Sequence, residues 1–482
     1  MKLSALFHGV GNIEDGSKWV YRDEREVSLV TDDSRKCIGN SLFVAIGGSR
    51  LDGASFIPDA HKRGARFFVA LSKIECPKDS AVIYSKNPRK TLAELLLNFY
   101  AHPETDMIFV GITGTKGKTT TGVMLKSILD FCGIKSVLIG SLGVRGVEYP
   151  RPKNTTPGPT EIAEILSLAR DSEMDVAIIE ASSQALKDFR LHGIPFHTVA
   201  FTGLGSDHVG GCEHSSAADY ARSKRTLFTS YGASCAVVNS DDSHASYISD
   251  GVRRVVGCGF SEDSEMQISS FSDAPSGSSF ILGESEVRLS LPGEYNARNA
   301  AIALGIAREI TGRPIRELAP ALRECRVDGR FEIYRVGDRR VIVDYAHNKD
   351  SFNAVCALTR RLFDGRIICV FGSVGDRAEG RRGELAVAAE RWAYLSVITS
   401  DDSGGELPIS ICAEIYSAFG DKSAAKIITD RKSAIEYALS VAKSDDTVLI
   451  LGRGEEGTMH QNGKVVDFSD VEFIKALAAE QN

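Results

Sequence analysis

Residues 111–121, GITGTKGKTTT, combine the residue types that bind phosphate groups. Gly114 and Gly117 allow backbone N–H groups to close around phosphate oxygens, and Lys118 supplies a cation. The hydroxyl of Thr119 can hold Mg²⁺ at the start of a following helix. The pattern therefore predicts a nucleoside triphosphate site, and the alternative is a flexible turn rich in glycine and threonine.

Side chains that could bind a metal occur at two later strand ends. Glu180 directly follows the apolar run DVAII, and His208 lies in GSDH after the run TVAF. Since open α/β sheets place ligands at the carboxyl ends of their strands, both could reach the mouth that holds Lys118. Taken alone, such residues are more often a surface carboxylate and a core histidine. Lys224, on a predicted helix sixteen residues after His208, by itself fits an exposed, solvated lysine.

An α/β fold is needed to position these residues, and the sequence predicts one. From residue 106, buried strand-like runs alternate with helical stretches, which implies a parallel sheet covered by helices. Residues 257–293 carry alternating strands between Ser and Gly clusters, which predicts a small antiparallel sheet. A second strand-helix series follows RVDGRFEIY, and each of its strands ends in a Gly- or Asp-rich turn.

The composition is that of a globular protein with several cores. The chain has 482 residues, of which 43% are hydrophobic and 25% charged, so more than one domain is expected. The net charge of -7 without a long basic run argues against nucleic acid as a partner. We expect a cytoplasmic location, because no segment has the apolar length of a signal peptide or a membrane span. The ten cysteines form no CxxC pair and are expected to be reduced.

The spacing within the phosphate loop is unusual, because Gly111 lies seven and Gly114 four positions before Lys118. This TGTxGKTTT form resembles that of the Mur ligase family, ATP-dependent amide-forming enzymes of peptidoglycan synthesis and related folyl-polyglutamate pathways. Further motifs follow in the family's order over essentially the whole chain. Those similar to the subgroup that adds the third residue of the stem peptide are TDDSRKCIGNSLFVAIGG, NTTPG and EASSQALKDFR.

The resemblance implies three domains and a reaction. The domains would be an N-terminal uridine-nucleotide-binding α/β module at 1–103, a central P-loop ATPase-like parallel sheet with the small antiparallel sheet at 104–328, and a C-terminal Rossmann-like α/β domain that binds the amino acid at 329–482. The γ-phosphoryl group of ATP would pass to a carboxylate of UDP-N-acetylmuramoyl-L-alanyl-D-glutamate, and a diamino acid would attack the acyl phosphate. The implied role is peptidoglycan synthesis in cell wall biogenesis, and hence in cell shape and cell division.

The resemblance also implies a set of site residues. The implied catalytic residues are Lys118, Glu180, His208 and Lys224, and the implied Mg²⁺ ligands are Thr119, Glu180, His208 and a carbamylated Lys224. The implied ATP contacts are Gly114, Thr115, Lys116, Gly117, Lys118, Thr119, Thr120, Asn299, Arg330 and Asp344. The implied acceptor contacts are Ser34, Arg35, Thr155, Thr156, Ser182 and Arg190, and the implied amino-acid contacts are Arg377, Asp401, Asp402, Gly452 and Glu456.

The loop that would select the amino acid departs from the family pattern. Enzymes that choose meso-diaminopimelate typically carry DNPR, whose Arg pairs with the distal carboxylate, but here the aligned stretch is DDSG and ends at Gly404. Asp402 and Glu455 also replace Asn and His of the common pattern and add negative charge. We therefore expect L-lysine, then L-ornithine, ahead of meso-diaminopimelate, unless Arg453 or Arg381 supplies a substitute cation.

Other departures keep different functions open. Lys116 stands where many members have Asn, Gln184 where many have His, Gly203 where they have Asn, and Asp328 where they have Pro. The alternatives are a ligase with another acceptor, such as a folate or cyanophycin-like polymer ligase, and a P-loop nucleotide switch. The expected partners are UDP-muramyl-dipeptide, ATP and an amino acid, with no membrane span, and the chain is expected to be a monomer.

Overall fold

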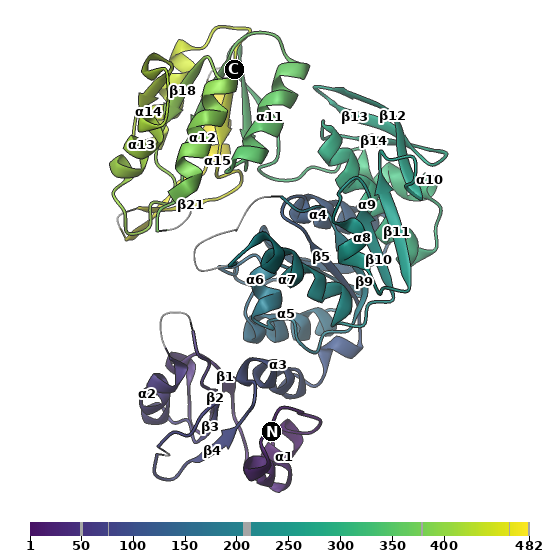
Figure 1. Ribbon diagram of the computed structural model, residues 1–482, viewed down its shortest axis with the longest axis vertical. Coiled ribbons are helices and arrows are strands. Elements are labelled where there is room, and N and C mark those ends of the chain that lie inside the picture. Colours follow the sequence, from purple (N-terminus) through teal and green to yellow (C-terminus); the bar gives the residue numbers. More distant parts are fainter. Residues whose placement is uncertain (49–51, 76, 206–213, 377–378, 462, 481–482) are drawn as a thin grey trace. The chain divides into compact units, whose positions relative to one another are not determined.

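The structure is a computed structural model that describes residues 1–48, 52–75, 77–205, 214–376, 379–461 and 463–480 (Figure 1). Its contacts divide the chain into two compact units. The first comprises 1–269, 282–285 and 298–321, and the second comprises 270–281, 286–297 and 322–482. Each unit is described by itself. The three domain ranges expected from the sequence stay predictions.

The first unit begins with a small parallel sheet, in the strand order β1-β2-β3-β4. Its strands are β1 (Val30–Thr31), β2 (Leu42–Val44), β3 (Phe67–Ala70) and β4 (Ala81–Tyr84), and its helices are α1 (Leu3–Leu6), α2 (Ile57–Lys62) and α3 (Pro88–Phe99). Helix α3 begins at Pro88, because the Asn87 side chain accepts a hydrogen bond from the Lys90 N–H and a proline suits the first turn. Its apolar face packs into the core with Leu42, Val44 and Phe67.

Within the described residues, the central sheet has ten strands in the order β14-β13-β12-β11-β10-β9-β5-β8-β6-β7. The strands are β5 (Ile108–Thr113), β6 (Ser136–Gly140), β7 (Gly143–Arg145), β8 (Val176–Glu180), β9 (Phe196–Phe201), β10 (Cys235–Asn239), β11 (Arg254–Gly259), β12 (Met266–Ala274), β13 (Gly277–Leu282) and β14 (Ser285–Leu289). The helices are α4 (Lys118–Phe131), α5 (Pro159–Asp171), α6 (Ser183–Lys187), α7 (Ala217–Thr229), α8 (Ala245–Ser249), α9 (Glu294–Thr311) and α10 (Ile315–Leu318).

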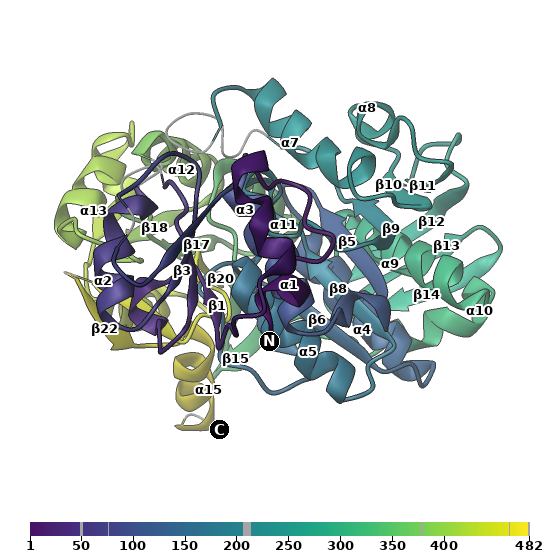
Figure 2. The same ribbon diagram turned by 90° about the horizontal axis from the view of Figure 1, so that it is seen from below.

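Strand β5 lies between β8 and β9 and pairs with both in parallel (Figure 2). These strands are almost entirely buried, as expected for apolar runs covered on both faces by helices. Their carboxyl ends therefore meet at one edge of the sheet, where the phosphate loop follows β5 and Glu180 ends β8. Strands β12, β13 and β14 are neighbours joined by two-residue connections, which fit antiparallel hairpins, and β11 pairs with β12 in parallel.

The second unit contains a six-stranded sheet in the order β15-β16-β20-β17-β18-β19. Strands β15 and β16 are antiparallel, and the other pairings are parallel. The strands are β15 (Glu332–Val336), β16 (Arg339–Asp344), β17 (Ile367–Phe371), β18 (Leu395–Ile398), β19 (Ala425–Ile427) and β20 (Thr447–Leu451), and a hairpin follows at β21 (Thr458–Gln461) and β22 (Lys464–Asp467). The helices are α11 (Lys349–Leu362), α12 (Glu379–Trp392), α13 (Pro408–Ser417), α14 (Arg431–Val441) and α15 (Asp470–Glu480).

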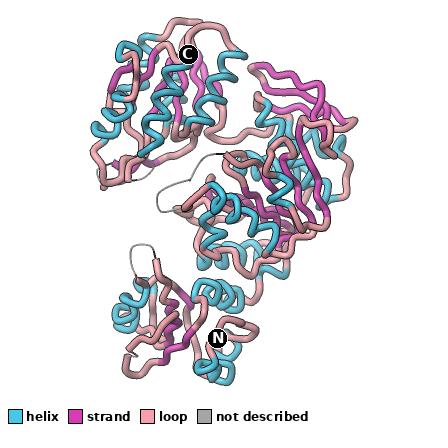
Figure 3. The backbone as a smooth tube through the Cα atoms, in the orientation of Figure 1, coloured by secondary structure: helices cyan, strands magenta, loops and turns pink. Residues whose placement is uncertain are grey.

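Helices cover both faces of this sheet (Figure 3). Successive residues of β16 belong to opposite cores, because side chains alternate between faces along a strand. Ile342 packs with apolar residues of α11, α12 and α13, whereas Val341 and Val343 pack with apolar residues of α14 and α15. The predicted strand-helix series after residue 330 is confirmed. No helix in the described ranges is both long enough and apolar enough to cross a membrane.

Candidate active site

The phosphate loop lies between β5 and α4, as predicted from its strand-turn-helix pattern. Gly114 and Gly117 both have positive φ angles, of 151° and 87°. A Cβ atom at Gly114 would collide with the Thr202 hydroxyl, and one at Gly117 would collide with the Asn299 side-chain oxygen. Both positions therefore require glycine, and the side chain of Asn299, one of the implied ATP contacts, lies directly against the loop.

Two lysine side chains converge on the carbonyl of Gly114. Lys118 Nζ donates to this oxygen at 3.0 Å and to the Thr115 carbonyl at 3.2 Å. Lys224 Nζ donates to the Gly114 oxygen at 2.9 Å and is buried, with 1% of the residue exposed. The simple expectation of an exposed, solvated Lys224 is therefore wrong. The ammonium groups of Lys118 and Lys224 both contact the phosphate loop.

Thr119 and Glu180 form the oxygen-rich part of the site. The Thr119 hydroxyl donates to Glu180 Oε2 at 2.9 Å, and Glu180 is fully buried. Ser141 also contacts this carboxylate, through its N–H to Oε1 at 3.0 Å and its hydroxyl to Oε2 at 3.3 Å. A carboxylate with hydroxyl neighbours is the hard donor set that suits Mg²⁺. His208, the other predicted ligand, lies outside the described residues.

Tyr220 belongs to the same cluster, although the sequence did not single it out. Its hydroxyl lies 3.0 Å from the Thr115 hydroxyl, and Lys224 Nζ lies 4.3 Å from its ring centroid. Tyr220 precedes Lys224 by four residues, so both occupy one face of α7. This four-residue spacing is the feature of the sequence that could have indicated Tyr220 as a neighbour of Lys224. Lys116 is half-buried beside the loop, and Thr120 is buried in the first turn of α4.

The two segments predicted to bind the muramyl dipeptide lie against each other. The Thr156 hydroxyl donates to the Glu180 carbonyl at 2.6 Å and accepts from the Ser182 N–H at 3.0 Å. Arg190 donates to the Thr156 carbonyl at 2.9 Å. The Thr155 hydroxyl lies 3.0 Å from the hydroxyl of Ser141, which itself contacts Glu180. Acceptor-type and metal-type side chains therefore form one connected network.

The two predicted uridine-module residues lie near one acidic turn. Ser34 is buried, and its hydroxyl donates to Asp59 Oδ2 at 3.1 Å. The Arg35 side chain is 80% exposed and pairs with Asp33 at 2.8 Å. An exposed guanidinium close to the end of β1 is available to an anionic ligand, since a surface ion pair of this kind is weak.

In the second unit, Asp344 holds two turns together. Its carboxylate accepts from the N–H groups of Phe331 and Ala346, each at 2.8 Å. The neighbouring Arg330 stacks on the ring of Tyr345, with 4.3 Å from its guanidinium carbon to the ring centroid. Both predicted ATP contacts of this unit, Arg330 and Asp344, therefore have fixed positions around the end of β16.

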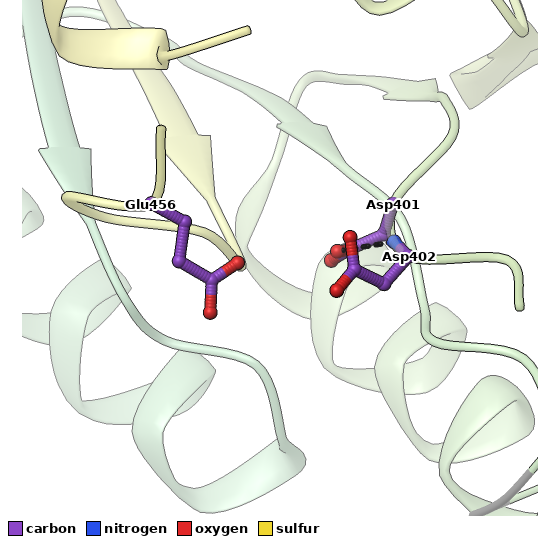
Figure 4. A group of neighbouring side chains, drawn as sticks. All are labelled: Asp401, Asp402 and Glu456. Carbon is purple, nitrogen blue, oxygen red and sulfur yellow. Dashed lines mark hydrogen bonds between the residues drawn. The ribbon is translucent and has the colours of Figure 1, made fainter. Parts of the chain in front are cut away.

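Three carboxylates of the second unit gather around one arginine. Asp401, Asp402 and Glu456 offer oxygens that all lie within 4.8 Å of one another (Figure 4). The fully buried Arg453 reaches all three: its Nη1 lies 3.0 Å from Asp402 Oδ1, 3.3 Å from Asp401 Oδ1 and 3.5 Å from Glu456 Oε2. Among the described residues of this cluster, which we call the acidic pocket, one guanidinium faces three carboxyl groups, so negative charge is in excess.

The electrostatics of Glu456 reflect this excess. Burial raises its pKa, the nearby Asp401 and Asp402 raise it further, and Arg453 only partly offsets them, so the pKa reaches about 7. Since burial disfavours an unpaired carboxylate, a cation placed beside Glu456 would favour the charged form. The geometry suits an ammonium group better than an additional carboxylate.

The backbone of the loop that carries this pocket disfavours an arginine at position 404. Gly404 has a φ angle of 56°, and a Cβ atom there would collide with the Asp376 carboxylate. Gly452, at the end of β20, has a φ angle of 112°, and its N–H donates to the Asp344 carbonyl at 3.2 Å. Arg377, the predicted clamp for the α-carboxylate, lies outside the described residues.

Comparison with known families covers most of the chain. Residues 26–100 match the Mur ligase family catalytic domain, residues 112–307 match the Mur ligase middle domain, and residues 329–454 match the Mur ligase glutamate ligase domain.

Two curated relatives extend the match over the full length. The UDP-N-acetylmuramoyl-L-alanyl-D-glutamate–2,6-diaminopimelate ligase of Caldanaerobacter subterraneus subsp. tengcongensis is 31% identical, covering 100% of this chain and 99% of the relative. The ligase of the same name from Bacillus licheniformis is 32% identical, covering 100% of both chains.

Solved structures support the fold. A structure of a UDP-N-acetylmuramoyl-L-alanyl-D-glutamate–2,6-diaminopimelate ligase has a TM-score of 0.68 at 23% identity, covering 100% of this chain and 99% of that one. The MurF ligase of Thermotoga maritima in complex with ADP has a TM-score of 0.61 at 18% identity, covering 94% and 97%. The predicted α/β fold class is confirmed. The chain belongs to the Mur ligase family and is an ATP-dependent amide-forming ligase.

Proposed function

We propose that this enzyme adds a diamino acid to UDP-N-acetylmuramoyl-L-alanyl-D-glutamate during peptidoglycan precursor synthesis. The preferred amino acid is L-lysine, with L-ornithine next and meso-diaminopimelate after both. The names of the two curated relatives support the acceptor and a diamino acid as the substrate class. The acidic pocket around Arg453 is the observation that carries the choice among diamino acids.

The reaction couples ATP cleavage to amide formation. A carboxylate oxygen of the acceptor attacks the γ-phosphorus of ATP, which forms an acyl phosphate and releases ADP. The α-amine of the amino acid then attacks the acyl carbon, phosphate leaves with its bonding electron pair, and the nitrogen loses a proton. Carboxylate activation is needed because an ionised carboxylate resists nucleophiles at neutral pH. Positive groups at the phosphates offset the charge that develops in both steps.

The side chains of the phosphate loop supply that positive environment. Lys118 and the loop N–H groups would bind the triphosphate, and Asn299, whose side chain lies against Gly117, is proposed to contact the adenine side. Thr119 and Glu180 would hold Mg²⁺, which when bound neutralises phosphate charge. The remaining proposed nucleotide contacts are Gly114, Thr115, Lys116, Gly117, Thr120, Arg330 and Asp344, with His208 as a further proposed ligand and catalytic residue.

The acceptor is proposed to bind through Ser34, Arg35, Thr155, Thr156, Ser182 and Arg190. The hydrogen bonds among Thr156, Ser182 and Arg190 support this role, because they fix polar groups beside the buried Glu180. Arg190 can offer cationic N–H groups to a carboxylate of the dipeptide. The uridine nucleotide of the acceptor would bind to the proposed domain 1–103, and ATP would bind to the proposed domain 104–328.

The C-terminal domain, proposed as 329–482, binds the amino acid. Arg377 would pair with its α-carboxylate, and Asp401, Asp402, Gly452 and Glu456 would surround its distal end. A distal ammonium adds one positive charge to a pocket that has three carboxylates and one guanidinium. The distal end of meso-diaminopimelate carries a carboxylate as well as an ammonium, so it has no net charge to offset the negative excess. An unpaired buried carboxylate also costs on the order of a few kcal/mol.

Lys224 is proposed to be carbamylated, which would turn a buried cation into an anion. Its placement at the Gly114 carbonyl supports a role at the phosphates but leaves its chemical state open to experiment. Enzyme equilibrated with ¹³C-labelled bicarbonate should give a carbamate NMR signal that is lost in Lys224→Arg. A spectrum identical for both proteins would remove carbamylation from the mechanism. The enzyme is further proposed to act in the cytoplasm as a monomer.

The proposed function is tested by a coupled assay of ADP release. Enzyme, ATP, Mg²⁺ and UDP-muramyl-dipeptide are combined with L-lysine, L-ornithine or meso-diaminopimelate in parallel reactions. The expected order of kcat/KM is lysine, then ornithine, then meso-diaminopimelate. A clear preference for meso-diaminopimelate would overturn the choice of amino acid. A rate of ADP release that is the same with and without each amino acid would overturn the assignment as a ligase that uses this acceptor.

A further inference from the structure

We propose that Arg431 is a positioning residue that sets the geometry of the amino-acid pocket without touching the substrate. Arg431 is the first residue of α14 and is buried, with 1% of the residue exposed. The inference rests on the proposed function, because it assigns Arg431 a role in the specificity of that same site. No role for this residue follows from the motifs of the sequence.

The guanidinium of Arg431 is held by a carboxylate from the last helix. Its Nε donates to Asp470 Oδ1 and its Nη2 donates to Asp470 Oδ2, both at 2.7 Å. Asp470 is the first residue of α15 and is fully buried. A bidentate pair of this kind fixes the plane of the guanidinium, so its remaining N–H groups point in defined directions.

Those remaining N–H groups bind the two loops that build the pocket. Nη1 donates to the Ser400 carbonyl at 3.2 Å, and Nη2 donates to the Leu451 carbonyl at 3.0 Å. Ser400 is bonded directly to Asp401, and Leu451 is the last residue of β20, two positions before Arg453. The Arg431 side chain therefore connects the segment that leads to Asp401 and Asp402 with the segment that leads to Arg453 and Glu456.

The topology explains why such a connection is needed. In the sheet order, β17 lies between β18 and β20, so the ends of β18 and β20 are not hydrogen-bonded to each other. Arg431 bridges these two strands past the intervening β17. Arg431 therefore adds a buried bridge between the two loops to the contacts that the Arg453 side chain and the His460 N–H make with Asp402.

The pocket is sensitive to that separation. Arg453 Nη1 contacts Asp402 at 3.0 Å and Asp401 at 3.3 Å across the two loops, and the contact with Asp401 is already longer than a usual N–H···O hydrogen bond. A shift of about 1 Å between reacting groups can change a rate about a hundredfold. Loss of the Arg431 contacts should therefore weaken recognition of the amino acid far more than recognition of ATP.

A double substitution tests this role while keeping the core filled. Arg431→Met with Asp470→Leu replaces the pair by apolar side chains of similar size, since replacing a buried ion pair in this way often preserves stability. The KM for lysine is expected to rise about tenfold or more, and the preference for lysine over ornithine to fall, with the KM for ATP changed less than twofold. Arg431→Lys should also raise the KM for lysine. It keeps a positive charge beside Asp470, but one ammonium group cannot bind the carboxylate and the carbonyls of Ser400 and Leu451 together.

The control is a second bidentate pair at the same sheet, between Arg366 and Asp446. Arg366 binds Asp446 through Nε and Nη2, with the shortest distance at 2.7 Å. These residues directly precede β17 and β20, so they lie at the amino ends of the strands, away from the pocket loops. Arg366→Met with Asp446→Leu is expected to lower the melting temperature without changing the KM for lysine.

The outcomes separate the inference from the function on which it rests. If wild-type enzyme ligates lysine and the folded Arg431 variants keep its KM, Arg431 has no positioning role. An equal loss for lysine and ATP, in parallel with melting temperature, would also overturn the inference, because it would mark a purely structural pair. If the double variant does not fold, Arg431→Lys decides by the same two KM values. Wild-type enzyme that fails to ligate any diamino acid would instead contradict the proposed function.

Discussion

The hydroxyl of Thr119, in the first turn of α4, donates a 2.9 Å hydrogen bond to Oε2 of Glu180, the last residue of β8, and both residues are buried. The bond joins the helix that follows the phosphate loop to the carboxylate at the end of β8. Because Glu180 also accepts two hydrogen bonds from Ser141, its orientation is determined from two sides. This small network is where loop, metal-type carboxylate and acceptor segments meet.

Thr119→Val should abolish most of the activity while leaving the fold intact. Valine has nearly the same shape but lacks the oxygen proposed to bind Mg²⁺, so kcat/KM for ATP is expected to fall about a hundredfold or more. Steady-state ADP release at saturating Mg²⁺ measures the effect.

Thr121→Val is the matched control on the same helix. Thr121 is also fully buried, and in the described part of the chain its hydroxyl has no hydrogen-bond partner. This substitution should be neutral or stabilising by up to about 1 kcal/mol, because it removes an unsatisfied polar group. Equal activity losses in both variants would argue against a specific role for the Thr119 hydroxyl.

The affinity for the diamino acid should depend on pH through Glu456. Its pKa of about 7 means that the carboxylate forms as the pH rises from 6 to 8, so the KM for lysine is expected to fall about tenfold over that range. The α-amine of lysine also loses protons as pH rises, so the ratio of wild type to Glu456→Gln isolates the contribution of Glu456. Glu472→Gln, which changes an exposed carboxylate paired with Lys475, serves as control. A pH profile unchanged by Glu456→Gln would contradict this role.

The ionised carboxylate of Glu456 should lower the free energy of unfolding at neutral and alkaline pH. Since the folded-state pKa of Glu456 is raised from 4.5 to about 7, protonated Glu456 favours the fold at acid pH, and this advantage is lost as pH rises through about 7. Glu456→Gln is therefore expected to raise the free energy of unfolding at pH 8 by on the order of 1–3 kcal/mol. Chemical denaturation at pH 5 and pH 8 measures this difference, and a variant less stable than wild type at pH 8 would contradict it.

Asp402→Asn should reduce the discrimination against meso-diaminopimelate. Asp402 accepts from Arg453 at 3.0 Å and from the His460 N–H at 2.9 Å, so the amide oxygen of asparagine can keep one shape-matched acceptor. With one negative charge fewer, the ratio of kcat/KM for lysine to that for meso-diaminopimelate is expected to fall about tenfold.

Gly404→Arg alone should not restore a diaminopimelate site. Its backbone is in the left-handed region and its Cβ would collide with Asp376, so a loss of stability is expected instead. Gain of diaminopimelate activity in Gly404→Arg without loss of stability would show that the loop is not constrained in this way. The same amino-acid panel and a thermal melt measure both variants.

Tyr220→Phe should weaken ATP binding through the loop that the hydroxyl supports. The phenol contacts the Thr115 hydroxyl at 3.0 Å in a buried setting, and its loss leaves that hydroxyl with the Gly205 N–H as a remaining partner. We expect a severalfold rise in the KM for ATP and a stability loss of about 1 kcal/mol. An unchanged KM for ATP would limit Tyr220 to a packing role. The KM for lysine should stay the same in this variant.

The sequence predicted the phosphate loop and the strand ends well, because these depend on local patterns. Residues 107–131 have the pattern of a buried apolar strand, a glycine-rich turn and a helix, and each part supports the assignment of the next. The structure has these three elements in that order. The alternation of strands and helices likewise predicted the parallel sheets. Glu180 ends β8, next to the strand that leads into the phosphate loop, so its place beside Thr119 could be inferred from topology alone.

What the sequence could not predict are contacts between distant segments. Arg431 and Asp470 are 39 residues apart on different helices, and each alone resembles an ordinary helix-terminal residue. Lys224 gave no sign of burial, because a polar helix exposes its lysines unless the fold places that face against another element. The role of Arg453 as a partner of Asp401, Asp402 and Glu456 also required the spatial arrangement of two loops.

Formation of the ligated nucleotide is the most direct measurement of the proposed chemistry. Mass spectrometry of a reaction with ATP, Mg²⁺, UDP-N-acetylmuramoyl-L-alanyl-D-glutamate and L-lysine follows product and ADP together. Wild-type enzyme is predicted to form one lysine-extended nucleotide for each ADP, and Lys118→Ala is predicted to form neither at a comparable rate. Lys118→Ala enzyme that joins lysine to the acceptor as fast as wild type would contradict the assignment of this loop to phosphoryl transfer.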